Sequence, residues 1–144
     1  MNYNVTKKNF IKPVILNLLM VNGNKNTSEK LLTKSFKLIQ KNTKKDFKLI
    51  LKSSLKSLSP TVSTLRIKKR KTITTVPFFL TKQKRLIHAI KLILSVSSKS
   101  SNKPYLLYQE LLQSSKNKGN LKSKIKELQS NAFINKNFSN YRWF

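Results

Sequence analysis

The strongest constraint on this sequence is a cationic run at residues 66–71, set between two segments rich in Thr, Val and Ile. The run holds five positive charges and one isoleucine, so it cannot enter a hydrophobic core, where unpaired charges are very costly. The flanking residues 61–64 and 72–76 favour extended backbone. Together these features predict a β-ribbon over residues 62–80 that projects from the body, carries cations at its tip and needs an anionic partner.

The charge of the whole chain points the same way. Its 144 residues include 31 Lys and Arg against four acids, which are Glu29, Asp46, Glu110 and Glu127, and the formal net charge is +27. Surface lysines that serve only solubility or helix ion pairs are normally balanced by acidic neighbours. The imbalance indicates nucleic acid as the partner, with an anionic membrane surface as the alternative.

Several classes of site are excluded by composition. The chain has no Cys, which rules out a disulfide framework and a thiolate metal site. The single histidine, His88, and the four scattered acids give no recognisable acid–base pair or metal cluster. We therefore expect no enzyme, no cofactor and no metal. The longest apolar run, residues 13–21, is about half as long as a membrane span and includes Asn17, so no membrane insertion is expected.

The spacing of apolar residues predicts a mainly α-helical single domain of about six helices, with the ribbon between the third and fourth. Residues 26–28 are predicted to cap the second helix and Asp46 to begin the third. Pro60 should end the third helix, because proline disfavours helical geometry in the residue before it. Helices are expected over residues 10–20, after 26–28, 46–58, 82–97, from 104 and from 121.

We divide the chain into three parts. Residues 1–9 form a short basic arm, residues 10–136 form the helical domain including the ribbon, and residues 137–144 form an aromatic and basic C-terminal tail.

Three stretches, in order, share residues with one known family. Residues 18–25 read Leu-Leu-Met-x-x-Gly-x-Lys and are followed by Ser-Glu-Lys-Leu at 28–31. Pro-Thr-Val at 60–62 precedes the basic run, and Val-Pro follows at 76–77. Residues 137–143 read Asn-Phe-Ser-Asn-Tyr-Arg-Trp. These residues stand at the joints between the predicted elements of a very basic chain. On this basis the sequence resembles the small-subunit ribosomal protein seven family of bacteria and organelles, over nearly its whole length.

The sequence also departs from the family. Members commonly have Gly-Gly in the turn of the ribbon, where this chain has Arg70 and Lys71. Two residues with side chains make a tight hairpin turn costly, so a longer, looser tip is expected. The arm before the first helix is shorter than usual, and Asn24 stands where the family prefers a lysine.

The resemblance implies a structural constituent of the small ribosomal subunit. Such a protein binds the 3′ major domain of the small-subunit rRNA, helps to nucleate assembly of the head, and places its ribbon near the exit-site tRNA and the mRNA exit path. Its partners would be rRNA and other head and platform proteins, without homo-oligomers. The residues alone leave open a non-ribosomal RNA- or DNA-binding protein, a disordered basic condenser, or a membrane-active amphipathic protein.

The resemblance and the composition also suggest a compartment. Lys, Asn, Ile and Phe are abundant, as expected for a protein encoded by an A/T-biased genome. The helical pattern of apolar residues begins near residue 10, so no presequence is expected. The aromatic residue after the terminal Trp resembles mitochondrial members. We therefore expect a mitochondrial, organelle-encoded protein, with the plastid as the alternative.

The candidate RNA contacts are cations beside the predicted turns and joints, because phosphate attracts Lys and Arg without regard to base sequence. On the ribbon they are Arg66, Lys68, Lys69, Arg70 and Lys71. Elsewhere they are Lys7, Lys8, Lys12, Lys25, Lys30, Lys34, Lys82, Lys84, Arg85, Lys116, Lys118, Lys122 and Lys124. In the tail, stacking and charge favour contacts with RNA or protein by Tyr141, Arg142 and Trp143, and the alternative is a tail packed against its own domain.

Overall fold

The computed structural model describes residues 11–97 and 102–141. Six α-helices and one antiparallel pair of strands follow one another in this part of the chain, and the pair lies between the third and fourth helices, as predicted. The elements are α1 (Ile11–Leu19), α2 (Lys25–Thr43), α3 (Phe47–Leu58), β1 (Val62–Lys69), β2 (Thr72–Phe79), α4 (Lys82–Ser97), α5 (Lys103–Ser115), α6 (Asn120–Ile134) and the short 3₁₀ helix η1 (Lys136–Phe138).

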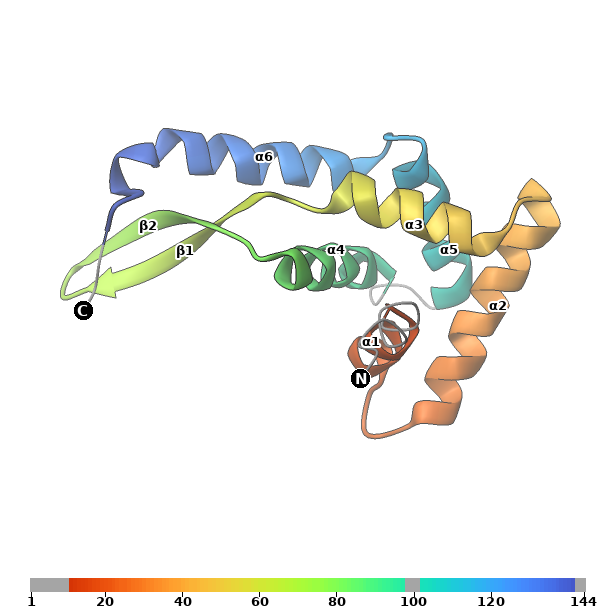
Figure 1. Ribbon diagram of the computed structural model, residues 1–144. Coiled ribbons are helices and arrows are strands. Elements are labelled where there is room, and N and C mark those ends of the chain that lie inside the picture. The colour runs from red at the N-terminus through yellow and green to blue at the C-terminus, as the bar shows by residue number, and fades with distance from the viewer. Residues whose placement is uncertain (1–10, 98–101, 142–144) are drawn as a thin grey trace, which may run out of the picture.

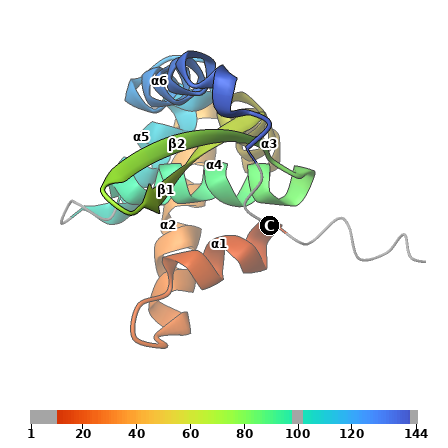
Figure 2. The same cartoon turned by 90° about the vertical axis from the view of Figure 1, so that its left-hand side faces the viewer.

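The helices form a body from which the two strands extend (Figure 1). Helix α5 lies at the centre of this body and packs against α2, α3 and α4. Helix α6 runs alongside the ribbon and packs on β1, while η1 contacts β2. The view in Figure 2 shows α6 above the ribbon and α4 behind it. The ribbon is thus a projection supported along part of its length by α6.

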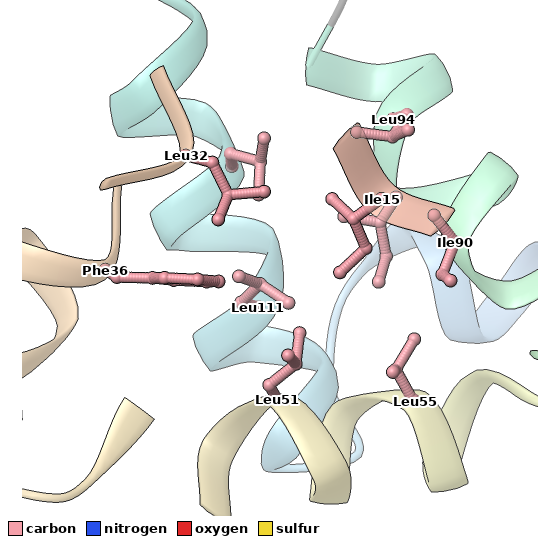
Figure 3. Close-up of a pocket in the computed structure, with 10 residues that line it drawn as sticks. Ile15, Leu32, Phe36, Leu51, Leu55, Ile90, Leu94 and Leu111 are labelled. Carbon is pink, nitrogen blue, oxygen red and sulfur yellow. The ribbon is translucent and has the colours of Figure 1, made fainter. Parts of the chain in front are cut away.

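Side chains from five helices converge in the core (Figure 3). Ile15 of α1, Leu32 of α2, Leu55 of α3, Ile90 of α4 and Leu111 of α5 are all buried around one point. The void left between them has a volume of only about 10 Å³. That is about the smallest space that can hold one water molecule, so the core offers no ligand site.

The second helix begins earlier than expected. Residues 26–28 were predicted to cap it, but α2 already starts at Lys25, directly after a turn in which Asn22 and Gly23 have φ angles of 52° and 73°. The Thr27 and Ser28 hydroxyls donate to the carbonyl oxygens of Asn24 and Lys25 (both 2.7 Å) instead of accepting from free amides. The capping prediction was therefore wrong, because these hydroxyls lie within the first turn of the helix.

The third helix begins and ends as its sequence predicts. The Asp46 carboxylate accepts a hydrogen bond from the backbone N–H of Lys48 (3.2 Å), which satisfies one of the unpaired amides of the first turn. The helix ends at Leu58, two residues before Pro60. The chain then enters β1 directly, so the position of Pro60 sets where the ribbon leaves the body.

Candidate nucleic-acid interface

The two strands of the ribbon pair in register from base to tip. Val62 pairs with Phe79 at the base and Lys69 pairs with Thr72 at the tip. Only Arg70 and Lys71 connect the strands, so the turn is a tight two-residue one. The expectation of a longer, looser tip was wrong. A tight turn of this kind needs a residue in the left-handed conformation, and Arg70 adopts it with a φ of 49°. This conformation costs a non-glycine residue about 1–2 kcal/mol.

The alternating geometry of a β-strand determines which face of the ribbon each cation lies on. Side chains at successive positions point to opposite faces, so Arg66 and Lys68 share one face and Ile67 lies on the other. Arg66 and Lys68 are exposed, whereas Ile67 is half-buried. Arg70 and Lys71 are exposed at the turn. Lys69 ends β1, but its side chain lies outside what the structure describes. Four cations therefore face solvent at the end of the projection that is farthest from the body.

The base of the ribbon is tied to the body by hydrogen bonds. The backbone N–H of Leu80 donates to the carbonyl oxygen of Thr61 (3.1 Å). The Nε–H of Arg85 donates to the carbonyl oxygen of Leu80 (3.0 Å), and this side chain is half-buried. Arg85 therefore links α4 to the exit of β2. Its predicted RNA contact remains a prediction and now concerns only the terminal nitrogens of the guanidinium group. Lys82 and Lys84, in the same turn of α4, are exposed.

The junction of α5 and α6 holds a second group of predicted contacts. Lys116, Lys118 and Lys124 are exposed there, whereas Lys122 is half-buried. The Nζ of Lys122 donates to the carbonyl oxygen of Ser57 (3.1 Å), near the C-terminal end of α3. The Lys122 ammonium therefore makes a hydrogen bond within the fold, and its predicted RNA contact remains a prediction.

Lys124 lies close to a partly buried acid. Burial raises the pKa of the Glu110 carboxyl above its ordinary value, and the Lys124 ammonium acts in the opposite direction. Among the residues that the structure describes, no group of three or more His, Asp or Glu side chains could hold a metal ion.

A third group of cations lies on α1 and α2. Lys12, Lys25, Lys30 and Lys34 are all exposed. On α2, the buried side chains of Leu32 and Ile39 lie on the face turned to the core. Lys25, Lys30 and Lys34 therefore lie along the solvent-exposed side of α2. Lys7, Lys8, Arg142 and Trp143 lie outside the described residues, and Tyr141 is half-buried at their edge.

Two features of the surface were not among the predicted contacts. A row of exposed lysines, one turn apart, runs along α3 at Lys48, Lys52 and Lys56. Their spacing of four is visible in the sequence, but an ordinary solvated helix face has the same spacing. The second feature is a pair of exposed aromatic side chains, Phe79 and Phe133. In the sequence, Phe133 does not fit the apolar stripe of α6, and this misfit could have indicated that the side chain is exposed.

The sequence of the chain matches a family of known proteins. The family model described as ribosomal protein S7p/S5e matches residues 3–136, well over half of the chain. The chain belongs to the ribosomal protein S7 family. Members of this family are structural proteins of the small ribosomal subunit, and the prediction that the chain is not an enzyme is confirmed by this membership.

Individual S7 relatives are similar to the chain over most of their length. The small ribosomal subunit protein uS7m of Reclinomonas americana is 28% identical over 130 residues, covering 89% of this chain and 82% of the relative. The uS7 proteins of Wigglesworthia glossinidia brevipalpis and Aliivibrio salmonicida are 29% and 27% identical, each covering 89% of this chain and 83% of the relative. Mitochondrial and bacterial members of the S7 family are thus equally similar to the chain.

Proposed function

We propose that this chain binds the 3′ major domain of the small-subunit rRNA and helps to nucleate assembly of the ribosomal head. The observation that carries the proposal is the ribbon, which holds Arg66, Lys68, Arg70 and Lys71 exposed at the end of a hydrogen-bonded projection. A tight turn restricts the positions of these cations before RNA binds, so less conformational entropy is lost on binding. A protein of the S7 family with a net charge of +27 has rRNA as its natural anionic partner.

The contacts are made mainly to phosphates. Structured RNA is recognised largely by shape, phosphate and 2′-hydroxyl groups, which suits lysines spread over several elements. We assign the contacts to three surfaces: the ribbon, the α1–α2 joint with Lys12, Lys25, Lys30 and Lys34, and the α5–α6 junction with Lys116, Lys118 and Lys124. The first turn of α4 adds Lys82 and Lys84. Cations are unfavourable at a helix N-terminus, so these two lysines do not serve to stabilise α4.

The ribbon has a second role in this proposal. Because it extends beyond the helical body, it reaches past the rRNA site and lies near the exit-site tRNA and the path by which mRNA leaves. Other head and platform proteins contact the remaining surface.

A charge-matched pair of variants tests the rRNA proposal. In the first, Arg66, Lys68, Arg70 and Lys71 are changed to Gln. In the control, four exposed lysines of α2 and α3 are changed to Gln, at Lys41, Lys48, Lys52 and Lys56. Binding to a 3′ major-domain rRNA fragment is then measured across a range of salt concentrations. Both variants lose the same charge, so only a difference between them reports on the location of the contacts.

The ribbon variant should bind more weakly and with a flatter salt dependence than the control. Each phosphate contact that is lost lowers the slope of log K against log salt by about 0.7–0.9. Equal slopes in the two variants would contradict the assignment of the ribbon as an RNA-binding element.

We propose further that the protein works in the mitochondrion, as an organelle-encoded component of its small ribosomal subunit. The support is a composition rich in Lys, Asn, Ile and Phe, as expected from an A/T-biased genome. The similarity to uS7m of Reclinomonas americana agrees with this assignment but is matched by that to bacterial uS7 proteins. Fractionation of the source cells tests this: the protein should sediment with mitochondrial small subunits at high salt. Recovery with plastid ribosomes would contradict the mitochondrial assignment, and recovery in free fractions would contradict the ribosomal one.

A further inference from the structure

An apolar groove lies between the base of the ribbon and the C-terminal end of α6. It has a volume of about 510 Å³. Val62 and Pro77 line it from the ribbon, Ala132 and Phe133 from α6, and Ser139 from the segment after η1. Phe79 contributes a further aromatic side chain. Figure 1 shows the end of α6, η1 and the ribbon at the same end of the molecule.

Several large apolar side chains at this groove are open to solvent. Phe79 is 83% exposed and Phe133 is 70% exposed. Phe78, which also lines the groove, is 38% exposed. Ile134, which follows Phe133 in the chain, is 72% exposed. Single exposed apolar side chains are common, but several beside a groove mark an interaction site.

The path of the chain brings its own tail to this groove. After α6, the backbone N–H of Phe138 donates to the carbonyl oxygen of Asn135 (3.0 Å), and that of Tyr141 donates to the carbonyl oxygen of Phe138 (3.1 Å). These bonds form a compact turn that contacts β2 and includes Ser139. The chain therefore leaves the described structure at Tyr141, two residues after a residue that lines the groove.

We propose that this groove is the docking site for Trp143 and Phe144 of the same chain. Extended backbone advances about 3.3–3.6 Å per residue, so both side chains are within reach of a groove that begins near Ser139. Both are large and apolar, as the groove is. A short tether also gives its end an effective concentration of roughly millimolar, which favours this occupant over any partner supplied from solution.

Two other occupants are weaker matches. A nucleobase could stack on Phe133, and Thr61, Gln129 and Ser139 could meet its polar edges. Such a base would have to be supplied by a separate molecule, whereas the tail is tethered beside the groove. The cation beside the site, the Nζ of Lys136, already lies 5.0 Å from the centroid of the Phe133 ring. An apolar segment of another protein would fit chemically, but it lacks the tether.

Trp143 is the only tryptophan in the chain, so its fluorescence reports on the tail alone. The emission maximum and acrylamide quenching are measured for the full chain and for a peptide of residues 137–144. A variant with Phe79→Ser and Phe133→Ser opens the groove. Leu49→Ser is the control, because Leu49 is similarly exposed (66%) but lies on α3. Circular dichroism verifies that all variants are folded.

The full chain should emit at shorter wavelength than the peptide and be quenched several-fold less by acrylamide. The groove variant should shift both properties towards those of the peptide, and Leu49→Ser should leave them unchanged. Peptide-like behaviour of the full chain, or an unchanged groove variant, would overturn the proposal. Shielding that appears only after rRNA is added would also overturn it and assign the tail to RNA. The comparison of the full chain, the peptide and the variants is made before any rRNA is added, so its outcome is independent of the rRNA proposal.

Discussion

The ammonium of Lys122 on α6 donates a hydrogen bond to the carbonyl oxygen of Ser57 near the end of α3, at a distance of 3.1 Å. The Ser57 hydroxyl in turn donates to Oδ1 of Asn117 (2.6 Å), in the turn between α5 and α6. The last carbonyls of a helix have no partner within the helix, and a cation near them is favourable. Lys122 therefore holds α6 against the end of α3, just before the chain enters the ribbon.

Replacing Lys122 with Met should destabilise the protein. The substitution keeps most of the length of the side chain but removes the charged donor, and a half-buried hydrogen bond of this kind contributes about 1 kcal/mol. Urea unfolding followed by circular dichroism measures the change. Lys126→Met, at an exposed position on the same helix, is the matched control. Equal unfolding midpoints for the two variants would show that the contact with Ser57 does not stabilise the fold.

Leu111 should be among the most sensitive core positions. It is 1% exposed and lies on α5, which packs against α2, α3 and α4. Leu111→Ala should lower the free energy of unfolding by about 2–5 kcal/mol, because it removes buried methyl groups and leaves a cavity. The same change at Leu49, which is exposed, should cost well under 1 kcal/mol. A small effect at Leu111 would mean that the core is less well packed than the structure indicates.

The turn of the ribbon allows its geometry to be separated from its charge. Arg70 has a φ of 49°, which glycine adopts without strain. Glycine relieves the strain of about 1–2 kcal/mol, but it loses about 0.5–1 kcal/mol more conformational entropy on folding. Arg70→Gly should therefore stabilise the hairpin by up to about 1 kcal/mol, while weakening RNA binding through the lost charge. Hydrogen exchange of the amides near the tip measures the first effect.

Lys71→Gly is the matched control for the turn. It removes the same charge at a residue that is not in the left-handed region, so it should make the hairpin open more readily. If both glycine variants changed protection equally, the strain attributed to Arg70 would be absent.

His88 should give the protein a dependence on pH. Burial, with a smaller contribution from Lys91, lowers the pKa of His88 below its ordinary value of 6.5. Its Nδ1 is buried and has no hydrogen-bond partner among the described residues. Between the lowered pKa and 6.5 the unfolded chain binds more protons than the folded one, so stability falls as the pH is lowered through that range.

His88→Gln should remove this contribution. Unfolding midpoints measured from pH values above 6.5 down to mildly acidic ones should fall less steeply in the variant than in the natural chain. Parallel curves would show that His88 is as easily protonated in the folded protein as in the unfolded one.

The elements that could be predicted from the sequence are those with local causes. Asp46 and Pro60 mark the two ends of α3 because a cap and a proline act on the nearest backbone. The ribbon was predictable because a dense cationic run between β-branched segments has no place in a core. Helix α2 was misplaced at its start because Thr27 and Ser28 can bond either to free amides or to carbonyls of the preceding turn.

The rest depended on tertiary context. The tight turn at Arg70 is set by the pairing of the strands, which outweighs the local cost of a left-handed residue. The internal hydrogen bonds of Arg85 and Lys122 join residues that lie 5 and 65 positions apart. In the sequence, neither side chain differs from the many cations that only face solvent, so their roles became visible only in the folded chain.

The central claim is that the exposed cations of the ribbon contact rRNA of the small subunit. Crosslinking of lysine to nucleotides in isolated small ribosomal subunits from the source organism tests it most directly. Lys68 and Lys71 should crosslink to nucleotides of the 3′ major domain, whereas Lys48, Lys52 and Lys56 on α3 should give few or no such crosslinks. Ribbon lysines that crosslink to no rRNA, or only to other rRNA domains, would contradict the claim.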